Sequence, residues 1–188
     1  MLILAGCGNT PALITSSPRT LTLSLSQLPF PGFIVENGSA TTGVISNSRA
    51  AAGDAALLRR FESEGRESGY IATFVREVSP QAVVGPVVIE STAATYRSVG
   101  GAASGLRQGA STLVQTGWQQ VSTGSLGQRA VGFTETKALA QTEYQSFVIL
   151  WLQANVVNEI RIAGNAATLD LTYALALARV QQRDETAR

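Results

Sequence analysis

The chain has 188 residues, a formal net charge of +1 and 14% charged residues, well below the share of about 25% in an average soluble domain. Its length predicts a single domain, and its near-neutral charge without a Lys/Arg cluster argues against nucleic-acid binding. The lack of His excludes a His-based triad and a His-containing zinc site, and the single Cys excludes an internal disulfide and any CxxC site.

The N-terminus contains a short motif with chemistry of its own, Leu4-Ala5-Gly6-Cys7. These four residues resemble the lipobox of bacterial lipoproteins. The resemblance implies that the thiol of Cys7 receives a diacylglyceryl group and that a signal peptide is cut just before Cys7. Ala5 and Gly6 suit a peptidase that approaches the backbone closely, and Leu4 fills its apolar pocket. The resemblance places the chain outside the cytoplasm, lipid-anchored to a membrane of the bacterial cell envelope.

The residues before the motif lack the rest of a signal peptide, which needs a basic region and about 7–15 apolar residues. Only six residues precede Cys7, and none of them is basic. The lipobox interpretation therefore implies a start codon further upstream, and the alternative is an accidental match with a buried or incidental Cys. The polar, Pro-interrupted run from Gly8 to Thr20 predicts a flexible tether, so residues 1–20 form a lipobox remnant and a tether.

The domain is expected to cover residues 21–183 and to begin with a half-buried strand, because leucines alternate with polar residues at positions 21, 23 and 25. A helix is expected over 49–64, with Ser46 or Asn47 as its cap, Gly53 as a weak point and Gly65 at its end. Two strands rich in Val, Ile and Thr follow at 70–78 and 83–96, as an antiparallel pair.

The second half of the chain predicts a helix over 101–114, closed by Gly117. Four strands of a meander are then expected at 118–122, 129–139, 144–152 and 156–163. In the last of them Val156, Ile160 and Ile162 alternate with Glu159 and Arg161, which places these two charged residues together on a wet face. A final helix is expected over 168–182 with Asn165 as its cap, before a frayed tail at 184–188.

This order of elements predicts an α+β fold with a mainly antiparallel sheet of about six or seven strands and three helices packed on it. Several weak runs carry a wider resemblance: Gly69-Tyr70 with Phe74, Val88-Ile89-Glu90-Ser91, Thr95-Tyr96, Gly100-Gly101-Ala102-Ala103, Leu126-Gly127, and Asn155-Val156-Val157 with Gly164. They resemble a broad group of uncharacterised bacterial lipoproteins whose fold is similar to the PsbP/Mog1-like α+β sandwich. The resemblance covers residues 21–182 and implies a location and an architecture more than an activity.

The sequence departs from this group after Gly127, where Gln128-Arg129 stands in place of the usual Asp-Glu. The loss of two carboxylates weakens the case for a metal or a charged ligand at this position, and Arg129 is interpreted as a solvated loop residue.

Two pairs of glutamates on expected strands are candidates for paired acid and base chemistry: Glu90 with Glu135, and Glu77 with Glu159. Glycosidase-type catalysis needs carboxyl groups about 5–9.5 Å apart, and the sequence fixes no such distance. Strand glutamates that face water are the favoured interpretation. Gly100 and Gly101 precede a helix whose N-terminus suits an anion, but no nucleotide-binding glycine pattern is present, so a permissive turn is favoured.

The charged run from Arg59 to Glu67 is interpreted as a solvated surface. Aromatic residues on expected strands are interpreted as cross-strand packing, with an apolar pocket between sheet and helix as the alternative: Tyr70, Phe74, Tyr96, Trp118, Phe133, Tyr144, Phe147 and Trp151.

The leading hypothesis is a lipid-anchored extracytoplasmic protein that acts as a non-catalytic binding, scaffold or assembly module. It has no catalytic residue, no metal and no cofactor, and its partners are the membrane and a protein or an apolar ligand. One alternative is a carrier of a small apolar ligand or a lipid, and a second is a carboxylate-dependent hydrolase.

Overall fold

The computed structural model describes residues 11–38, 41–77, 84–139 and 142–186. In these residues one antiparallel sheet of eight strands packs with five α-helices. The α+β class and the antiparallel sheet are confirmed. The expected numbers of about six or seven strands and three helices are corrected to eight and five, because three-residue strands and short helices carry little periodicity in the sequence.

The strand order is β1-β3-β4-β8-β7-β6-β5, with β2 also paired to β3. The last four strands form the expected meander. The strands are β1 (Phe33–Val35), β2 (Gly43–Ile45), β3 (Arg66–Arg76), β4 (Pro86–Tyr96), β5 (Gln119–Val121), β6 (Arg129–Leu139), β7 (Thr142–Gln153) and β8 (Val156–Asn165).

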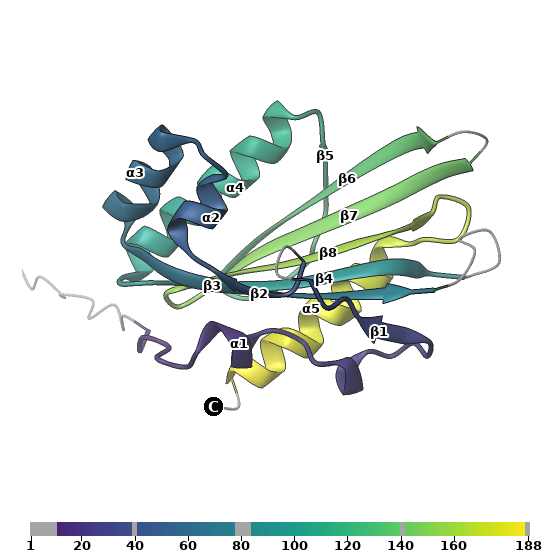
Figure 1. Ribbon diagram of the computed structural model, residues 1–188, viewed down its shortest axis with the longest axis horizontal. Helices are drawn as coiled ribbons and strands as arrows, with labels where there is room; N and C mark the ends of the chain where they lie inside the picture. The colour runs from purple at the N-terminus through teal and green to yellow at the C-terminus, as the bar shows by residue number, and fades with distance from the viewer. Residues whose placement is uncertain (1–10, 39–40, 78–83, 140–141, 187–188) are drawn as a thin grey trace, which may run out of the picture.

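The helices lie on both faces of the sheet (Figure 1). The lower face of the sheet is covered along its length by α5, and the upper face is covered at one end by α2, α3 and α4. The helices are α1 (Pro18–Leu21), α2 (Asn47–Ala51), α3 (Ala55–Glu64), α4 (Val99–Gln115) and α5 (Leu171–Thr186), with a short 3₁₀ turn at Leu25–Gln27.

Two apolar clusters result from this arrangement. The lower cluster lies between the sheet and α5 and includes Trp151, Ile160 and Leu177, all fully buried. The upper cluster lies between the sheet and α4 and includes Leu106 and Leu150. The central strand β7 contributes to both clusters, which explains its unbroken apolar run from Phe147 to Leu152.

The strand expected from Leu21 to Leu25 is wrong. Pro18 occupies the start of α1, where its missing N–H costs nothing, and Leu21 ends that helix. Leu23 is buried, but its N–H donates to the Ser91 side chain at 2.8 Å instead of to a ladder partner. Leu25 is 43% exposed in the 3₁₀ turn. Alternating leucines here reflect an irregular segment that covers the sheet.

The helix expected over 49–64 is two helices. Ala52 and Gly53 take positive φ angles of 47° and 89°, which ends α2. The Asp54 side chain then accepts hydrogen bonds from the first turn of α3. Ser46 caps α2 and Gly65 ends α3 in the left-handed conformation, and both assignments are confirmed.

The final helix begins later and ends later than expected. Asp170 accepts from the N–H of Thr172 at 2.7 Å in the first turn of α5, whereas Asn165 accepts from Ala167 in the preceding turn. Asn165 is therefore not the cap of this helix. Because α5 continues to Thr186, the helix includes part of the tail expected to fray at 184–188.

The tether expected over residues 8–20 is packed on the domain in its second part. The backbone of Ile14 exchanges two hydrogen bonds with the Asn155 side chain, at 2.7 and 3.2 Å. The lipobox residues Leu4 to Cys7 lie outside the described residues. Within the described ranges, no helix is both long enough and apolar enough to cross a membrane.

Candidate functional site

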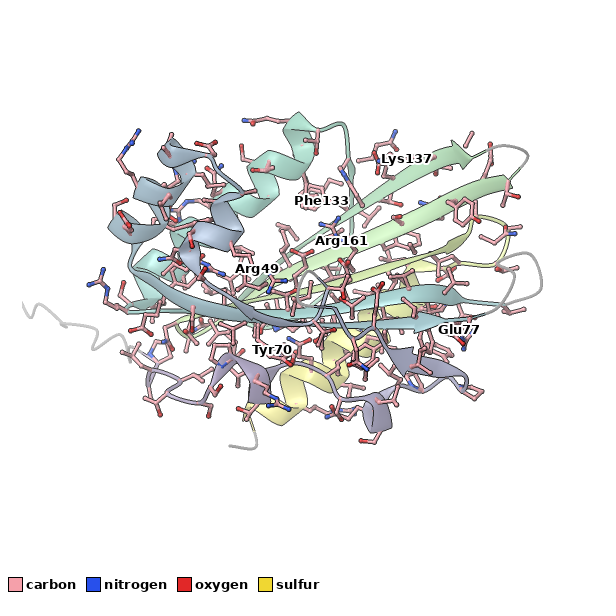
Figure 2. All side chains as sticks on the ribbon, viewed as in Figure 1. Arg49, Tyr70, Glu77, Phe133, Lys137 and Arg161 are labelled. Carbon is pink, nitrogen blue, oxygen red and sulfur yellow. The ribbon has the colours of Figure 1, made fainter. Side chains whose placement is uncertain are left out.

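The upper face of the sheet combines apolar and charged residues. Ala94, Val148 and Leu150 belong to the upper cluster, which packs against α4. Beside them, the upward positions of β4 and β8 include Glu90, Glu159 and Arg161, in the alternation that the sequence predicts for β8; Arg161 stands opposite Val148, and Glu159 stands opposite Leu150. We call this part of the sheet the open face. Figure 2 shows Arg161 and Lys137 on the same side of the sheet as α4.

Arg161 lies at the centre of the open face. Its Nη2 atom is 3.2 Å from Oε1 of Glu159, and its Nε atom is 3.5 Å from Oε2 of Glu90. Strand pairing creates this cluster, because Glu90 stands directly opposite Arg161 across β4 and β8. The guanidinium group also lies 5.6 Å from the ring centre of Trp118, within the range of a cation–π interaction.

The electrostatics of the open face favour cations. Burial raises the pKa of Glu90, Arg161 opposes this rise, and the carboxylates of Glu159 and Glu36 add to it. The carboxylate of Glu159 raises the pKa of Arg161. Glu135 lies on the neighbouring strand β6 and pairs with Lys137 at 2.9 Å. Carboxylates thus outnumber cations around Arg161.

The cluster adds little to the stability of the fold. The side chains of Arg161, Glu90 and Glu159 are 40%, 32% and 26% exposed. Ion pairs that solvent reaches contribute roughly 0–1 kcal/mol each, because water screens the attraction and the long side chains lose entropy. The stability of the fold therefore depends little on this group of charges.

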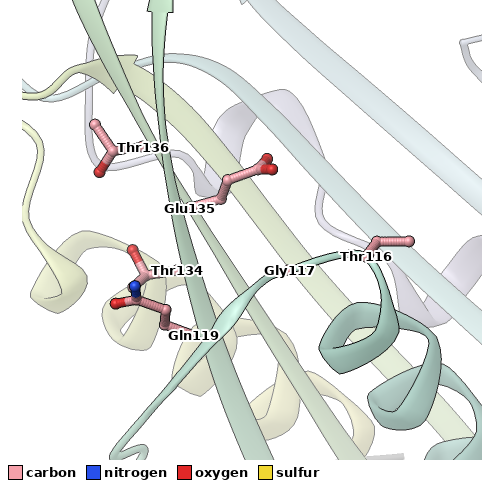
Figure 3. Close-up of a pocket in the computed structure, with 6 residues that line it drawn as sticks. All are labelled: Thr116, Gly117, Gln119, Thr134, Glu135 and Thr136. Atoms are coloured by element: carbon pink, nitrogen blue, oxygen red, sulfur yellow. The ribbon is translucent and has the colours of Figure 1, made fainter.

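Two hollows adjoin this cluster. The edge hollow has a volume of about 340 Å³ and is lined by Thr116, Gly117, Gln119, Thr134, Glu135 and Thr136. Figure 3 shows Glu135 pointing from β6 towards the turn at Gly117, whereas Thr134 and Thr136 point to the other side of the strand. Trp118 lies in the chain between Gly117 and Gln119, so its contact with Arg161 links the edge hollow to the ion cluster.

The second, helix–sheet hollow has a volume of about 240 Å³ and lies between α3, α4 and the sheet. Apolar side chains dominate its lining, and Glu159 and Arg161 close one end. Its lining residues are Leu57, Phe61, Gly105, Gln108, Gly109, Thr112, Leu113, Leu150, Glu159 and Arg161.

A buried arginine holds α2 and α3 against the sheet beside this hollow. Nη1 of Arg66 donates to Asn47 Oδ1 at 2.7 Å and to the Ile45 carbonyl at 3.2 Å, and its guanidinium lies 5.2 Å from the ring centre of Phe61. Burial lowers the pKa of Arg66 and raises the pKa of the neighbouring Tyr96 to about 12. These contacts fix the walls of the hollow.

The glutamate pairs considered from the sequence do not form as pairs. Glu90 and Glu135 both lie on the upper face, but each has its own cation, Arg161 and Lys137. The pairing of β3, β4 and β8 puts Glu77 and Glu159 six residues out of register, about 20 Å along the strands. The structure instead brings Glu90 and Glu159 together around Arg161.

Close packing accounts for Gly101 at the start of α4, whereas a Cβ at Gly100 would have nothing within 4 Å. The N–H of Gly101 donates to the Ser98 side chain at 3.0 Å. A Cβ at position 101 would lie 2.0 Å from the Glu64 carbonyl oxygen.

Arg129 is exposed, as expected, but begins β6 instead of lying in a loop. Among the described residues, no group of three His, Cys, Asp or Glu side chains could hold a metal ion.

Sequence reasoning missed two members of the site. Trp118 is not on a strand but in the turn between α4 and β5, where it contacts Arg161. Glu36 follows β1 and reaches the surroundings of Glu90 through the pairing of β1 with β3. The sequence signal for the site was the placement of Glu159 and Arg161 on one face of β8. No local pattern in the sequence shows which strands lie next to β8 in the sheet.

Comparison with known proteins shows the fold alone. No family model matches the chain, and no curated protein sequence matches it. The chain is similar in structure to the extracellular domain of PknH from Mycobacterium tuberculosis, with a TM-score of 0.58 and 11% sequence identity. The likeness covers 90% of this chain and 95% of that domain.

Proposed function

We propose that this chain is a lipid-anchored extracytoplasmic protein, a non-catalytic binding, scaffold or assembly module whose binding site is the open face around Arg161. The observation that carries the proposal is the solvent-reached cluster of Arg161, Glu90 and Glu159 between two hollows. Charges in such a position contribute little to the stability of the fold, and they can contact a ligand or partner.

Two independent features support the extracytoplasmic location. Leu4-Ala5-Gly6-Cys7 matches the lipobox pattern, and the structural neighbour is an extracellular domain. Two or three acyl chains on Cys7 and its amino group would anchor the protein stably. A PsbP/Mog1-like lipoprotein remains our interpretation of the family.

The arrangement of the carboxylates favours binding over catalysis. Glu90 and Glu159 share one guanidinium, so Arg161 occupies both carboxylates instead of leaving them as a facing acid and base pair. A carboxylate-dependent hydrolase is therefore the weaker alternative. A carrier of a small apolar ligand is the stronger alternative, because Leu57, Phe61 and Leu113 line the helix–sheet hollow.

The anchor is tested by expressing the gene with its native upstream region and weighing the intact protein from the membrane fraction. We expect a chain that begins at Cys7 with added acyl mass, and a Cys7→Ser control that carries no acyl group. An unmodified wild-type chain that begins at Met1 would contradict the lipid anchor. The match to the lipobox would then be accidental.

The binding face is tested by placing a photo-crosslinking amino acid at exposed positions in living cells. Lys137 lies on the same side of the sheet as Arg161, with 68% of its side chain exposed, whereas Ala176 lies on the outer side of α5. We expect adducts from position 137 and few from position 176. Equal labelling from both positions would contradict a binding site on the open face.

A screen of hydrolase substrates with the wild type and Glu90→Gln tests the enzymatic alternative, which predicts an activity that this substitution abolishes.

A further inference from the structure

The helix–sheet hollow leaves an apolar stripe of α3 only half-buried. Leu57 and Phe61 are one turn apart on this helix and line the hollow, yet no residue of α3 is fully buried. The apolar stripe of a surface helix normally packs against the core. Leu113 and Leu150 on the other walls are almost fully buried, so the hollow is the place where this apolar surface is incomplete.

One glycine of α4 keeps this hollow open. A Cβ at Gly105 would lie 2.1 Å from the Tyr96 hydroxyl oxygen, so packing requires a glycine there. A Cβ at Gly109 would meet only Leu150 Cδ1, at an ordinary contact distance of 3.6 Å. Glycine inside a helix costs about 1 kcal/mol relative to alanine. Gly109 is therefore unexplained by packing and is explained by the space that it leaves in the hollow.

More carboxylates than cations surround the charged end of the hollow. Glu159 and Arg161 line this end, and Glu90, outside the lining, contacts the same guanidinium. The carboxylates of Glu36, Glu90, Glu135 and Glu159 stand against the cations of Arg161 and Lys137 around this end, which leaves a net charge of −2. Arg60 adds a cation on the α3–α4 side, where it donates to Gln108, another lining residue.

These charges determine whether the hollow favours a cationic or an anionic ligand. An anion that approached Arg161 would meet Glu159 and Glu90, which already bind the guanidinium. An ammonium group would instead donate to carboxylate oxygens that have capacity for further hydrogen bonds, and charge-assisted bonds of this kind are the stronger ones. The volume of about 240 Å³ suits one ring or a short alkyl chain.

We propose that the helix–sheet hollow binds a small molecule with an apolar body and a single ammonium group, the apolar body against Leu57, Phe61 and Leu150 and the ammonium group on Glu159. This inference rests on the proposed binding function and names the chemical class of its ligand.

The test compares two probes of nearly equal size and opposite charge, 2-phenylethylammonium and 3-phenylpropanoate. Titration into the full chain is followed by the ¹³C-methyl shifts of Leu57, Leu113 and Leu150. We expect the cation to shift these methyl groups with a millimolar dissociation constant. The anion should bind on the order of tenfold more weakly, because it lacks the charge-assisted bonds.

Two variants locate the binding. Gly109→Leu should fill the hollow and abolish the shifts, while a melting curve shows that the variant remains folded. Glu159→Gln should weaken the cation on the order of tenfold and reduce the difference between the two probes. Glu143→Gln removes one carboxylate at the exposed start of β7, outside the hollow, and should leave both titrations unchanged.

The outcomes separate this inference from the proposed function. Absence of binding by the cation, or unchanged binding in a folded Gly109→Leu variant, would overturn the inference. Binding of 3-phenylpropanoate at the same methyl groups with equal or higher affinity would overturn the charge assignment while leaving a binding module. Equal crosslinking from positions 137 and 176 would instead overturn the proposed function itself.

Discussion

The two faces of the sheet are made by alternate residues of the same strands, yet they differ in how their polar groups are satisfied. On the lower face, Ser91 and Asn158 of the sheet are buried against Gln181 of α5. Ser91 Oγ donates to Gln181 Oε1 at 2.7 Å, and Gln181 Nε2 donates to Asn158 Oδ1 at 3.2 Å. On the upper face, Glu90 and Arg161 remain within reach of solvent.

This difference separates residues that hold the fold together from residues that are available to a ligand. A buried polar group costs free energy unless the chain itself satisfies it, and these three side chains satisfy one another within the lower face. The charges of the open face carry no such requirement, because water reaches them. Substitutions on the two faces should therefore have effects of very different size.

The largest effect is expected in the lower cluster. Trp151 is fully buried between the sheet and α5, and Trp151→Ala should lower the free energy of unfolding by about 3–5 kcal/mol, since it removes a large apolar surface and leaves a cavity. Urea denaturation followed by circular dichroism measures this loss. A smaller loss of unfolding free energy than that of Arg161→Gln on the upper face would contradict the difference between the two faces.

The polar network of the lower face should give the next largest effect. Gln181 is 1% exposed and also donates to the Thr92 carbonyl at 3.2 Å. Gln181→Ala should cost about 2–4 kcal/mol, because it leaves a cavity and removes hydrogen-bond partners from buried groups. Arg161→Gln on the open face is the matched comparison, with an expected cost below about 1 kcal/mol. Equal losses in the two variants would contradict the division of roles.

Two glycines of one helix sharpen the comparison within the upper face. Gly105→Ala should destabilise the fold by about 1–3 kcal/mol, because the new methyl group meets the buried Tyr96 hydroxyl. Gly109→Ala should stabilise it by about 0.5–1 kcal/mol, since the added Cβ has room and alanine favours a helix. Thermal unfolding of both variants decides the matter, and the same sign for both would count against the open hollow.

The smallest effect is the pH dependence of Glu90. Burial raises its pKa above the ordinary value of 4.5. A carboxyl group with a raised pKa in the folded state favours folding below its unfolded pKa and loses that contribution as the pH rises through its folded pKa. The stability of the wild type relative to Glu90→Gln should therefore decrease as the pH rises from 4.5 through the raised pKa of Glu90. Denaturant titrations across this range measure it, with Glu143→Gln as the exposed control, and a difference that increases with pH would contradict it.

Much of the sheet could be predicted from local patterns. The expected strand at 129–139 has the observed bounds of β6, and the alternation of Val156, Ile160 and Ile162 with charged residues gave the correct buried face of β8. Strands and helices of ten residues or more repeat their period often enough to be recognised. The leucines at 21, 23 and 25 wrongly predicted a strand. A segment that packs irregularly on a sheet can bury alternate residues without forming the hydrogen bonds of a strand.

The site was less accessible to sequence reasoning than the fold. Glu159 and Arg161 were placed correctly on one wet face, because both belong to β8. The contact of Arg161 with Glu90 depends on the pairing of two strands about 70 positions apart, and that of Trp118 depends on how a turn folds back over the sheet. Such contacts arise from strand order and register, which no short-range pattern records.

The hydrogen bonds between Asn155 and Ile14 would limit how far the domain can stand from a membrane if Cys7 carries the proposed lipid. Asn155 also donates to the Tyr96 carbonyl at 2.7 Å, so the segment around Ile14 is bound to the end of β4 and to the turn between β7 and β8. Ile14 lies seven positions after Cys7, and a fully extended chain of that length spans at most about 25 Å. An acyl group on Cys7 would therefore keep this end of the sheet close to the lipid headgroups, and molecules that the domain met there would be those that concentrate at the bilayer surface.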